Sequence, residues 1–207
     1  MNNTKKRNIS TTTIVIIIFL LLTGTTLAYF FASDTDLSIT GDMGDVKLSV
    51  TVTKVLPNTN KTDDIFVIGF DELASSINKD CMDDGYALCQ VYKINLVNGN
   101  NGVNTDIRGS LSFDSENTPN LSWLYLGHTF NTNTTYTSAM LGNTFNKASS
   151  TYTNFIDSYL LEKGSNVNFY IVLWVNESQI EQNDEGIFNA TVRFDASNGK
   201  GVTATFS

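Results

Sequence analysis

Apolar and polar residues alternate along most of the chain after residue 45. In residues 46–53 every second residue is Val or Leu and the residues between them are Lys, Ser or Thr, a pattern typical of a half-buried β-strand. The stretch 168–175 is apolar on both faces, which predicts a strand at the centre of a sheet. Four further alternating runs predict strands, at 86–96, 107–113, 188–194 and 202–206.

Helical patterns are few. Residues 70–79 begin with an Asp-Glu pair suited to a helix N-terminus and carry Leu73 and Ile77 four residues apart. Residues 154–163 are followed by Gly164, a common helix stop, so a second short helix is predicted there. The stretch between the two, 129–153, is rich in Asn and Thr and weakly periodic, and we expect a surface excursion rather than a second domain.

These elements predict an all-β fold. Seven or so short strands with one or two short helical insertions favour an antiparallel β-sandwich, either jelly-roll or immunoglobulin-like. We expect the sandwich to span residues 46–207, with a flexible N-terminal segment at 29–45. The turn residues of "NGNNG" at 98–102 support a strand-rich chain.

The N-terminus has the order of a signal peptide. A basic start is followed by nine apolar residues at 14–22 and then by small residues. The best-placed cleavage site follows Ala28, which makes Tyr29 the first residue of the mature chain. The alternative is a retained membrane anchor, because residues 14–32 just reach the length of about 20 that spans a bilayer.

The exit from this leader, "LTGTTLAYFFASDTD" at 22–36, resembles the precursors of the TasA/camelysin family. There a Gly-rich stretch precedes aromatic-Ala-Tyr-Phe-Ser-Asp, and a SipW-type signal peptidase cuts near the Ala. Here the glycine run is reduced to Gly24. The resemblance covers residues 14–36 and implies a secreted, biofilm-matrix fibre protein with a jelly-roll fold.

The excess of acidic residues limits the classes of molecule that the protein can bind. The chain has 13 basic and 21 acidic residues, and loss of the leader would remove three of the basic ones, Lys5, Lys6 and Arg7. Such an acidic protein is not suited to nucleic acid or to anionic lipid headgroups. We expect contact with the membrane only through the leader, and association with other copies and with other matrix or surface proteins.

The two cysteines, Cys81 and Cys89, predict a disulfide, since a close pair outside the cytosol most often forms one. Two free thiols are the alternative. Asp80, Asp83 and Asp84 crowd the same loop and could offer oxygens to calcium, but they lack the ligand spacing of a known calcium loop. A solvated acidic turn is favoured, and no cofactor is expected.

No enzyme is predicted. His-Glu-x-x-His is absent, and the single histidine, His128, cannot build the usual zinc site, although camelysin-like proteins have been classed as metallopeptidases. His128 is expected at a loop or strand end. Glu177 with Asp184 or Glu185 could form an acid–base pair, but they flank a polar connection that favours a solvated turn.

The segment after the cleavage site suggests how copies assemble. It carries three aromatic residues, and Leu37 and Ile39 then restart a period of two before Gly41 and Gly44. We hypothesise that residues 29–40 insert as a donated strand into the next subunit, with side chains of Phe30, Leu37 and Ile39 in its groove. The alternative is that the segment forms the first strand of its own domain.

The predicted function is therefore a secreted structural subunit of an extracellular matrix fibre or surface layer. No sorting signal or second apolar segment is seen near "GVTATFS", which also favours attachment by association. A membrane-tethered extracellular binding module, using its long Asn/Thr-rich loop, is the alternative. A secreted peptidase is a third, less favoured one.

Overall fold

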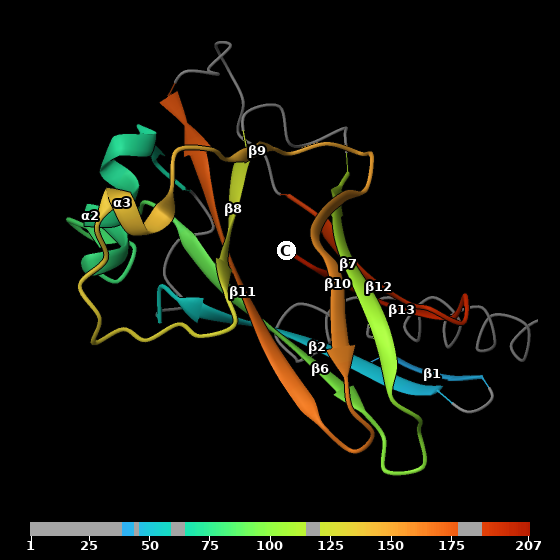
Figure 1. Ribbon diagram of the computed structural model, residues 1–207. Coiled ribbons are helices and arrows are strands. Elements are labelled where there is room, and N and C mark those ends of the chain that lie inside the picture. The colour runs from blue at the N-terminus through green and yellow to red at the C-terminus, as the bar shows by residue number, and fades with distance from the viewer. Residues whose placement is uncertain (1–38, 44–45, 59–64, 115–120, 178–187) are drawn as a thin grey trace, which may run out of the picture. The chain divides into compact units, whose positions relative to one another are not determined.

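The computed structural model describes residues 39–43, 46–58, 65–114, 121–177 and 188–207. All of these residues lie in one compact unit, Asp36–Ser207. This unit is built mainly from two antiparallel sheets, which confirms the predicted all-β sandwich with short helical insertions (Figure 1).

The larger sheet has seven strands, in the order β1-β2-β6-β11-β8-β9, with β3 pairing in parallel with the end of β11. Its strands are β1 (Ile39–Met43), β2 (Val46–Leu56), β3 (Val67–Ile68), β6 (Gln90–Asn98), β8 (Leu121–Gly127), β9 (Asn146–Lys147) and β11 (Asn166–Asn176). As predicted, the doubly apolar stretch forms a central strand, β11, between β6 and β8.

The smaller sheet has four strands, in the order β10-β7-β12-β13. They are β7 (Thr105–Phe113), β10 (Thr153–Leu161), β12 (Ala190–Ala196) and β13 (Gly201–Phe206). Two further strands, β4 (Met82–Asp83) and β5 (Tyr86–Ala87), form a separate hairpin. The alternating residues of β2, β6, β7, β12 and β13 are buried in one core between the two main sheets, as their period of two requires.

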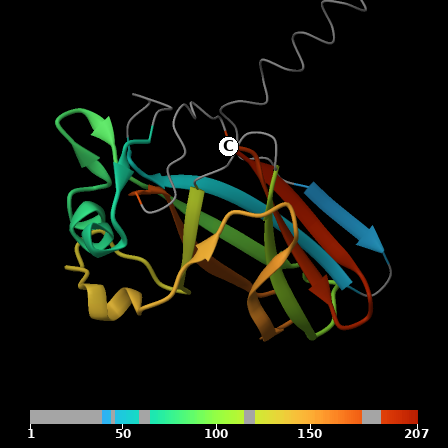
Figure 2. The ribbon, with the colours of Figure 1, turned by 90° about the horizontal axis from the view of Figure 1, so that it is seen from above.

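A second, smaller core lies on the outer face of the larger sheet. There Val172 and Trp174 of β11 are fully buried beneath helix α2 (Leu73–Asn78), which follows the 3-10 turn η1 (Phe70–Glu72), and beside Leu141 of α3 (Ser138–Leu141). Both views place α2 and α3 together on this side of the molecule (Figure 2). The predicted helix at 70–79 is thus confirmed, with its first turn in the 3-10 form.

The predicted helix at 154–163 is wrong, because residues 154–161 belong to β10 and residues 162–163 to the connection that follows it. Two register shifts interrupt its pairing with β7, one between Asn154 and Ile156 and one between Ile156 and Tyr159. Each bulge adds residues to one strand only, so the apolar residues recur three apart instead of two. That spacing imitates a helix. Gly164, read as a helix stop, instead lies with φ +71° in the β10–β11 connection.

Strand β8 was not predicted. Its first four residues, Leu121–Leu124, are all buried, since the strand is covered by the sandwich core on one face and by the outer core on the other. A short strand covered on both faces shows no alternation, and its serine, Ser122, further obscures it.

Candidate functional site

The candidate site is the edge of the larger sheet formed by β1 and β2, where the predicted donor segment enters the domain. The two strands form an antiparallel ladder in which Ile39 pairs with Val50 and Met43 with Val46. Only Gly44 and Asp45 connect them. Among the described strands β1 forms a ladder with β2 alone, so five residues of edge strand are held in the sheet from one side.

Strand β2 is fixed in the domain by its pairing with β6 and by its packing in the sandwich core. Its opposite side pairs with β6 from Leu48 to Leu56, and Val46, Leu48, Val50 and Val52 are buried in the sandwich core. Strand β13 of the smaller sheet packs against both β2 and β1 (Figure 2). The edge of β2 is therefore a rigid template that accepts an antiparallel strand through its backbone N–H and C=O groups.

The residues predicted to donate a strand are placed in part. Ile39 lies in β1 and pairs within its own domain, so for residues 39 and 40 the structure shows the alternative, a first strand of the same sandwich. The sheet thus takes in residues that the sequence assigned to the flexible segment. Phe30 and Leu37 lie outside the described residues, as do Ala28 and Tyr29 at the predicted cleavage site.

The sequence analysis gave a first strand within the same domain only as the alternative to strand donation, and it did not name β2 as the partner of that strand. A usable signal was present, because Ile39 continues a period of two and Gly44 starts a two-residue connection to a confident strand. Such a connection is typical of a hairpin.

The predicted disulfide is confirmed. Cys81 and Cys89 are bonded, with their Cα atoms 4.9 Å apart, and both are buried in the outer core. The bond closes the loop that carries the β4–β5 hairpin, whose turn uses Asp84 and Gly85 at positive φ. A disulfide of this kind is typical of proteins that fold in an oxidising compartment.

The aspartates of this loop lie at its surface. Asp80, Asp83 and Asp84 are exposed, and Lys79 Nζ lies 3.5 Å from Asp83 Oδ1. Within the described ranges no group of three or more His, Cys, Asp or Glu side chains is arranged to hold a metal ion. The described residues also include no helix of the length and apolarity needed to cross a membrane.

His128 directly follows β8, at the strand end where it was expected. Its exposed ring packs 5.0 Å from that of Tyr159 and 5.1 Å from that of Phe169, between the two sheets. Burial, with a smaller contribution from Tyr159, raises the pKa of neighbouring Tyr125 to about 12, so its hydroxyl stays neutral. Among the described residues, the rings of Tyr125, Tyr159 and Phe169 lie around His128.

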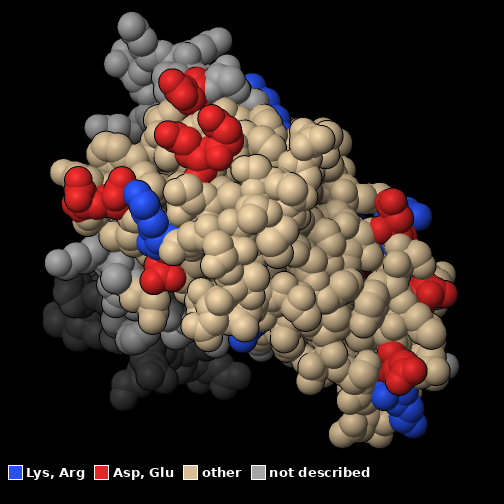
Figure 3. Space-filling model, turned by 60° about the vertical axis from the view of Figure 1, so that its left-hand side comes forward, with Lys and Arg blue, Asp and Glu red and all other residues tan. Residues whose placement is uncertain are grey.

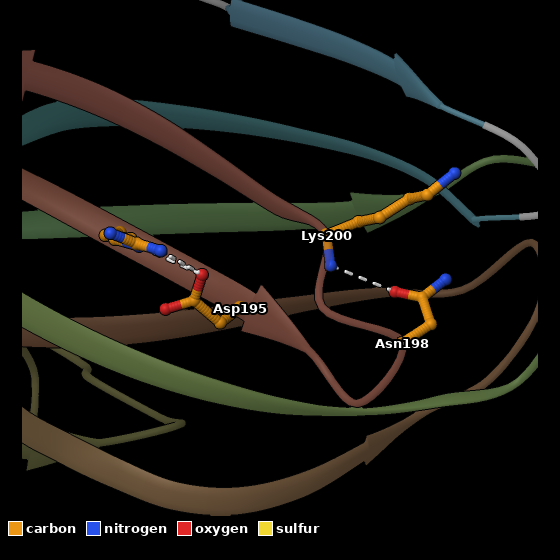
Figure 4. Close-up of polar contacts among 4 residues, drawn as sticks. Asp195, Asn198 and Lys200 are labelled. Carbon is orange, nitrogen blue, oxygen red and sulfur yellow. Dashed lines mark hydrogen bonds and ion pairs between the residues drawn. The ribbon is translucent and has the colours of Figure 1, made fainter.

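Glu177 follows β11 at its C-terminal end, and Asp184 and Glu185 lie outside the described residues. Elsewhere the described ion pairs are local. Arg193 donates from Nε and Nη2 to Oδ1 of Asp195, at 2.9 and 2.8 Å, and this hydrogen bond, with the charge of Asp195, raises the pKa of Arg193. The backbone N–H of Lys200 donates to Asn198 Oδ1 in the next turn (Figure 4). The first contact lies within β12, and the second lies within the turn between β12 and β13.

Comparisons with known proteins add little to this description. No family model matches the chain, and no curated protein matches it. Among solved structures, a FixG-related protein from Vibrio parahaemolyticus is similar at 10% identity and a TM-score of 0.31, covering 77% of this chain and 94% of its own. The putative ApaA protein from Bordetella pertussis shows 10% identity and a TM-score of 0.28, with 80% and 93% covered.

Proposed function

We propose that this chain is a secreted structural subunit of an extracellular fibre, in which each copy gives its N-terminal strand to the next. The observation that carries the proposal is β1, a five-residue edge strand joined to β2 by two residues and paired with β2 alone among the described strands. The same ladder can form between copies if β1 and the residues before it leave their own β2 and pair with the β2 of a neighbour. Exchange of an identical element is a low-cost route to assembly.

Other features support this proposal. The leader has the order of a signal peptide, its exit resembles TasA/camelysin precursors, and the buried disulfide suits an oxidising destination. A fibre built by head-to-tail exchange leaves an unused donor strand at one end and an unused acceptor edge at the other, so the assembly is open and grows.

Export with cleavage after Ala28 is the first expected result. Intact-mass and N-terminal peptide analysis of the protein released by the producing cells should find Tyr29 as its first residue. A membrane-bound product that still begins at Met1 would favour the tethered binding module instead.

Deleting residues 29–40 from the mature protein tests the exchange itself. The sandwich core is built from side chains of β2, β6, β7, β11, β12 and β13, which the deletion leaves in place. The shortened protein should therefore fold and stay monomeric in sedimentation while the full mature chain forms fibres. Alanine substitution of Glu162 and Lys163, exposed residues of the β10–β11 connection that lie outside β1 and β2, is a control that should leave fibre growth intact. Fibres from the deleted protein would contradict strand exchange.

A further inference from the structure

Two aromatic side chains pack against each other on the surface, beside the loop that the disulfide closes. Phe66 and Tyr86 are each 48% exposed, and neither belongs to the sandwich core or to the outer core. Their ring centroids lie 4.4 Å apart, with the ring planes inclined at 50°. Single exposed apolar residues are common, but rings gathered at one place on a surface mark a contact site. The two residues are here termed the aromatic pair.

The backbone that carries the aromatic pair is ordered by contacts of its own. The N–H of Phe66 donates to the carbonyl of Ala87 at 2.7 Å, and the N–H of Leu88 donates to the carbonyl of Cys81 at 2.8 Å. The disulfide between Cys81 and Cys89 closes the β4–β5 hairpin at its base, and the hairpin projects from the domain, in green, beside α2 (Figure 2). Because these contacts already order the hairpin, binding here costs little further conformational entropy.

Carboxylates stand beside the aromatic pair. Asp83 is the direct partner of Tyr86 in the β4–β5 ladder, so the two side chains leave the same face of the hairpin with Cβ atoms about 4.5–5.5 Å apart. Asp84 follows in the turn, and both aspartates are exposed. Lys79 Nζ lies 3.5 Å from Asp83 Oδ1, in a pair whose two side chains are each 54% exposed. Such a pair contributes little stability, so another cation can replace Lys79 there.

The charge around this site favours a cation. Figure 3 turns this side of the molecule forward and shows acidic side chains gathered on the left of the view, with few basic ones among them. The whole chain has 21 acidic and 13 basic residues. It therefore attracts basic partners and repels copies of itself, so the occupant of this site carries the opposite charge.

The smaller sheet shows which side chain suits an aromatic ring beside an aspartate. The guanidinium of Arg193 lies 5.8 Å from the ring centroid of Tyr152, and it donates two hydrogen bonds to Oδ1 of Asp195. The face of the ring attracts the cation, and the carboxylate accepts its N–H groups. The hairpin presents the same two groups at exposed positions.

We infer that the aromatic pair, with Asp83 and Asp84, is a docking surface for an arginine-bearing segment of a partner protein. Arginine suits the site better than lysine, because its planar guanidinium stacks on a ring and still donates to a carboxylate. The surface lies outside β1 and β2, so the inference does not rest on strand exchange.

The experiment titrates the exported protein with a short peptide of alternating Arg and Gly and follows the ring resonances of Phe66 and Tyr86 by NMR. Both rings should shift, with a dissociation constant of about 1 mM or lower. A peptide of alternating Lys and Gly should bind more weakly, and one of Ser and Gly should leave both rings unshifted. Higher salt should weaken binding of the Arg-Gly peptide, since it screens exposed charges.

Variants separate the rings from the charges. Phe66→Ala and Tyr86→Ala should each raise the dissociation constant about twofold to fivefold, as the loss of an exposed cation–π contact does, and the remaining ring reports it. Tyr86→Phe keeps the ring and should bind as the wild type does. Asp83→Asn should weaken binding about twofold or more. Asp157→Asn removes the same charge at an exposed residue of β10, outside this surface, and should leave binding unchanged.

The measurement uses the soluble fraction, so it gives a result whether or not strand exchange builds fibres. Rings that stay unshifted at Arg-Gly concentrations above about 5 mM would overturn the inference, as would equal binding of the Ser-Gly peptide. Equal weakening by Asp83→Asn and Asp157→Asn would overturn it too, because the attraction would then be one of net charge alone. Ring shifts with a soluble cello-oligosaccharide but not with the Arg-Gly peptide would assign the rings to carbohydrate instead.

Discussion

A disulfide that ties β1 to the β2 of its own domain is expected to abolish fibre growth. Thr40 and Ser49 are partners in the β1–β2 ladder, and directly paired residues have Cβ atoms about 4.5–5.5 Å apart, close to disulfide reach. In the oxidised Thr40→Cys/Ser49→Cys protein β1 cannot leave its own sheet. Light scattering and electron microscopy should find soluble molecules for this variant, whereas the proposed function predicts fibres for the wild type.

Reduction of the locked protein should restore growth. The control is the wild type treated with the same reductant. It shows any effect that the reductant has on fibre growth through the native Cys81–Cys89 disulfide, which is buried. Thr40→Cys alone, which cannot form the bond within one domain, should assemble. An oxidised double variant that polymerises at the wild-type rate would show that β1 does not exchange.

Truncation of Trp174 is expected to have the largest effect on stability. The indole is fully buried, with its ring 5.9 Å from that of Phe70 and 5.4 Å from that of Phe145. It therefore connects β11 both to η1, which holds Phe70, and to the segment after α3, which holds Phe145. Trp174→Ala should lower the free energy of unfolding by about 3–5 kcal/mol, as other large core truncations do. Denaturant titration followed by circular dichroism measures this loss.

Hydrogen exchange measured along the chain gives a second test of the Trp174→Ala variant. Hydrogen exchange should rise first in residues 128–147 and in α2, which rest on this ring, before it rises in the sandwich core. Trp174→Phe should cost much less, because it keeps an aromatic ring and the indole Nε1 makes no hydrogen bond within the described structure. A loss below about 1 kcal/mol for Trp174→Ala would mean that the outer core does not depend on this ring.

Several strands could be predicted because only one of their two faces is buried, which leaves an alternating pattern in neighbouring residues. In β2, β12 and β13 every second residue enters the core, so the sequence itself shows the period of two. The disulfide was predictable for a similar reason, since eight residues of separation bring the two cysteines within reach of each other. Neither inference needed knowledge of a distant partner.

Other elements depended on partners that the local pattern does not reveal. Strand β10 has the apolar spacing of a helix because its bulges match it to β7, and Gly109 of β7 leaves room there for the ring of Phe155. Strand β8 shows no alternation because a second core covers its outer face. The stretch 128–152 could be recognised as a surface excursion, but not as the cover of that core.

The sequence by itself determined the all-β class, the central position of β11, the helix after Gly69 and the pairing of Cys81 with Cys89. These follow from which residues prefer water and which do not, read over a few neighbours at a time. Only the tertiary structure decided that β1 completes its own sheet, that β10 is a strand, and that the segment 128–152 is fixed over Trp174. Each of these depends on backbone ladders and ring contacts between residues far apart in the chain, whose free energy outweighs local preference.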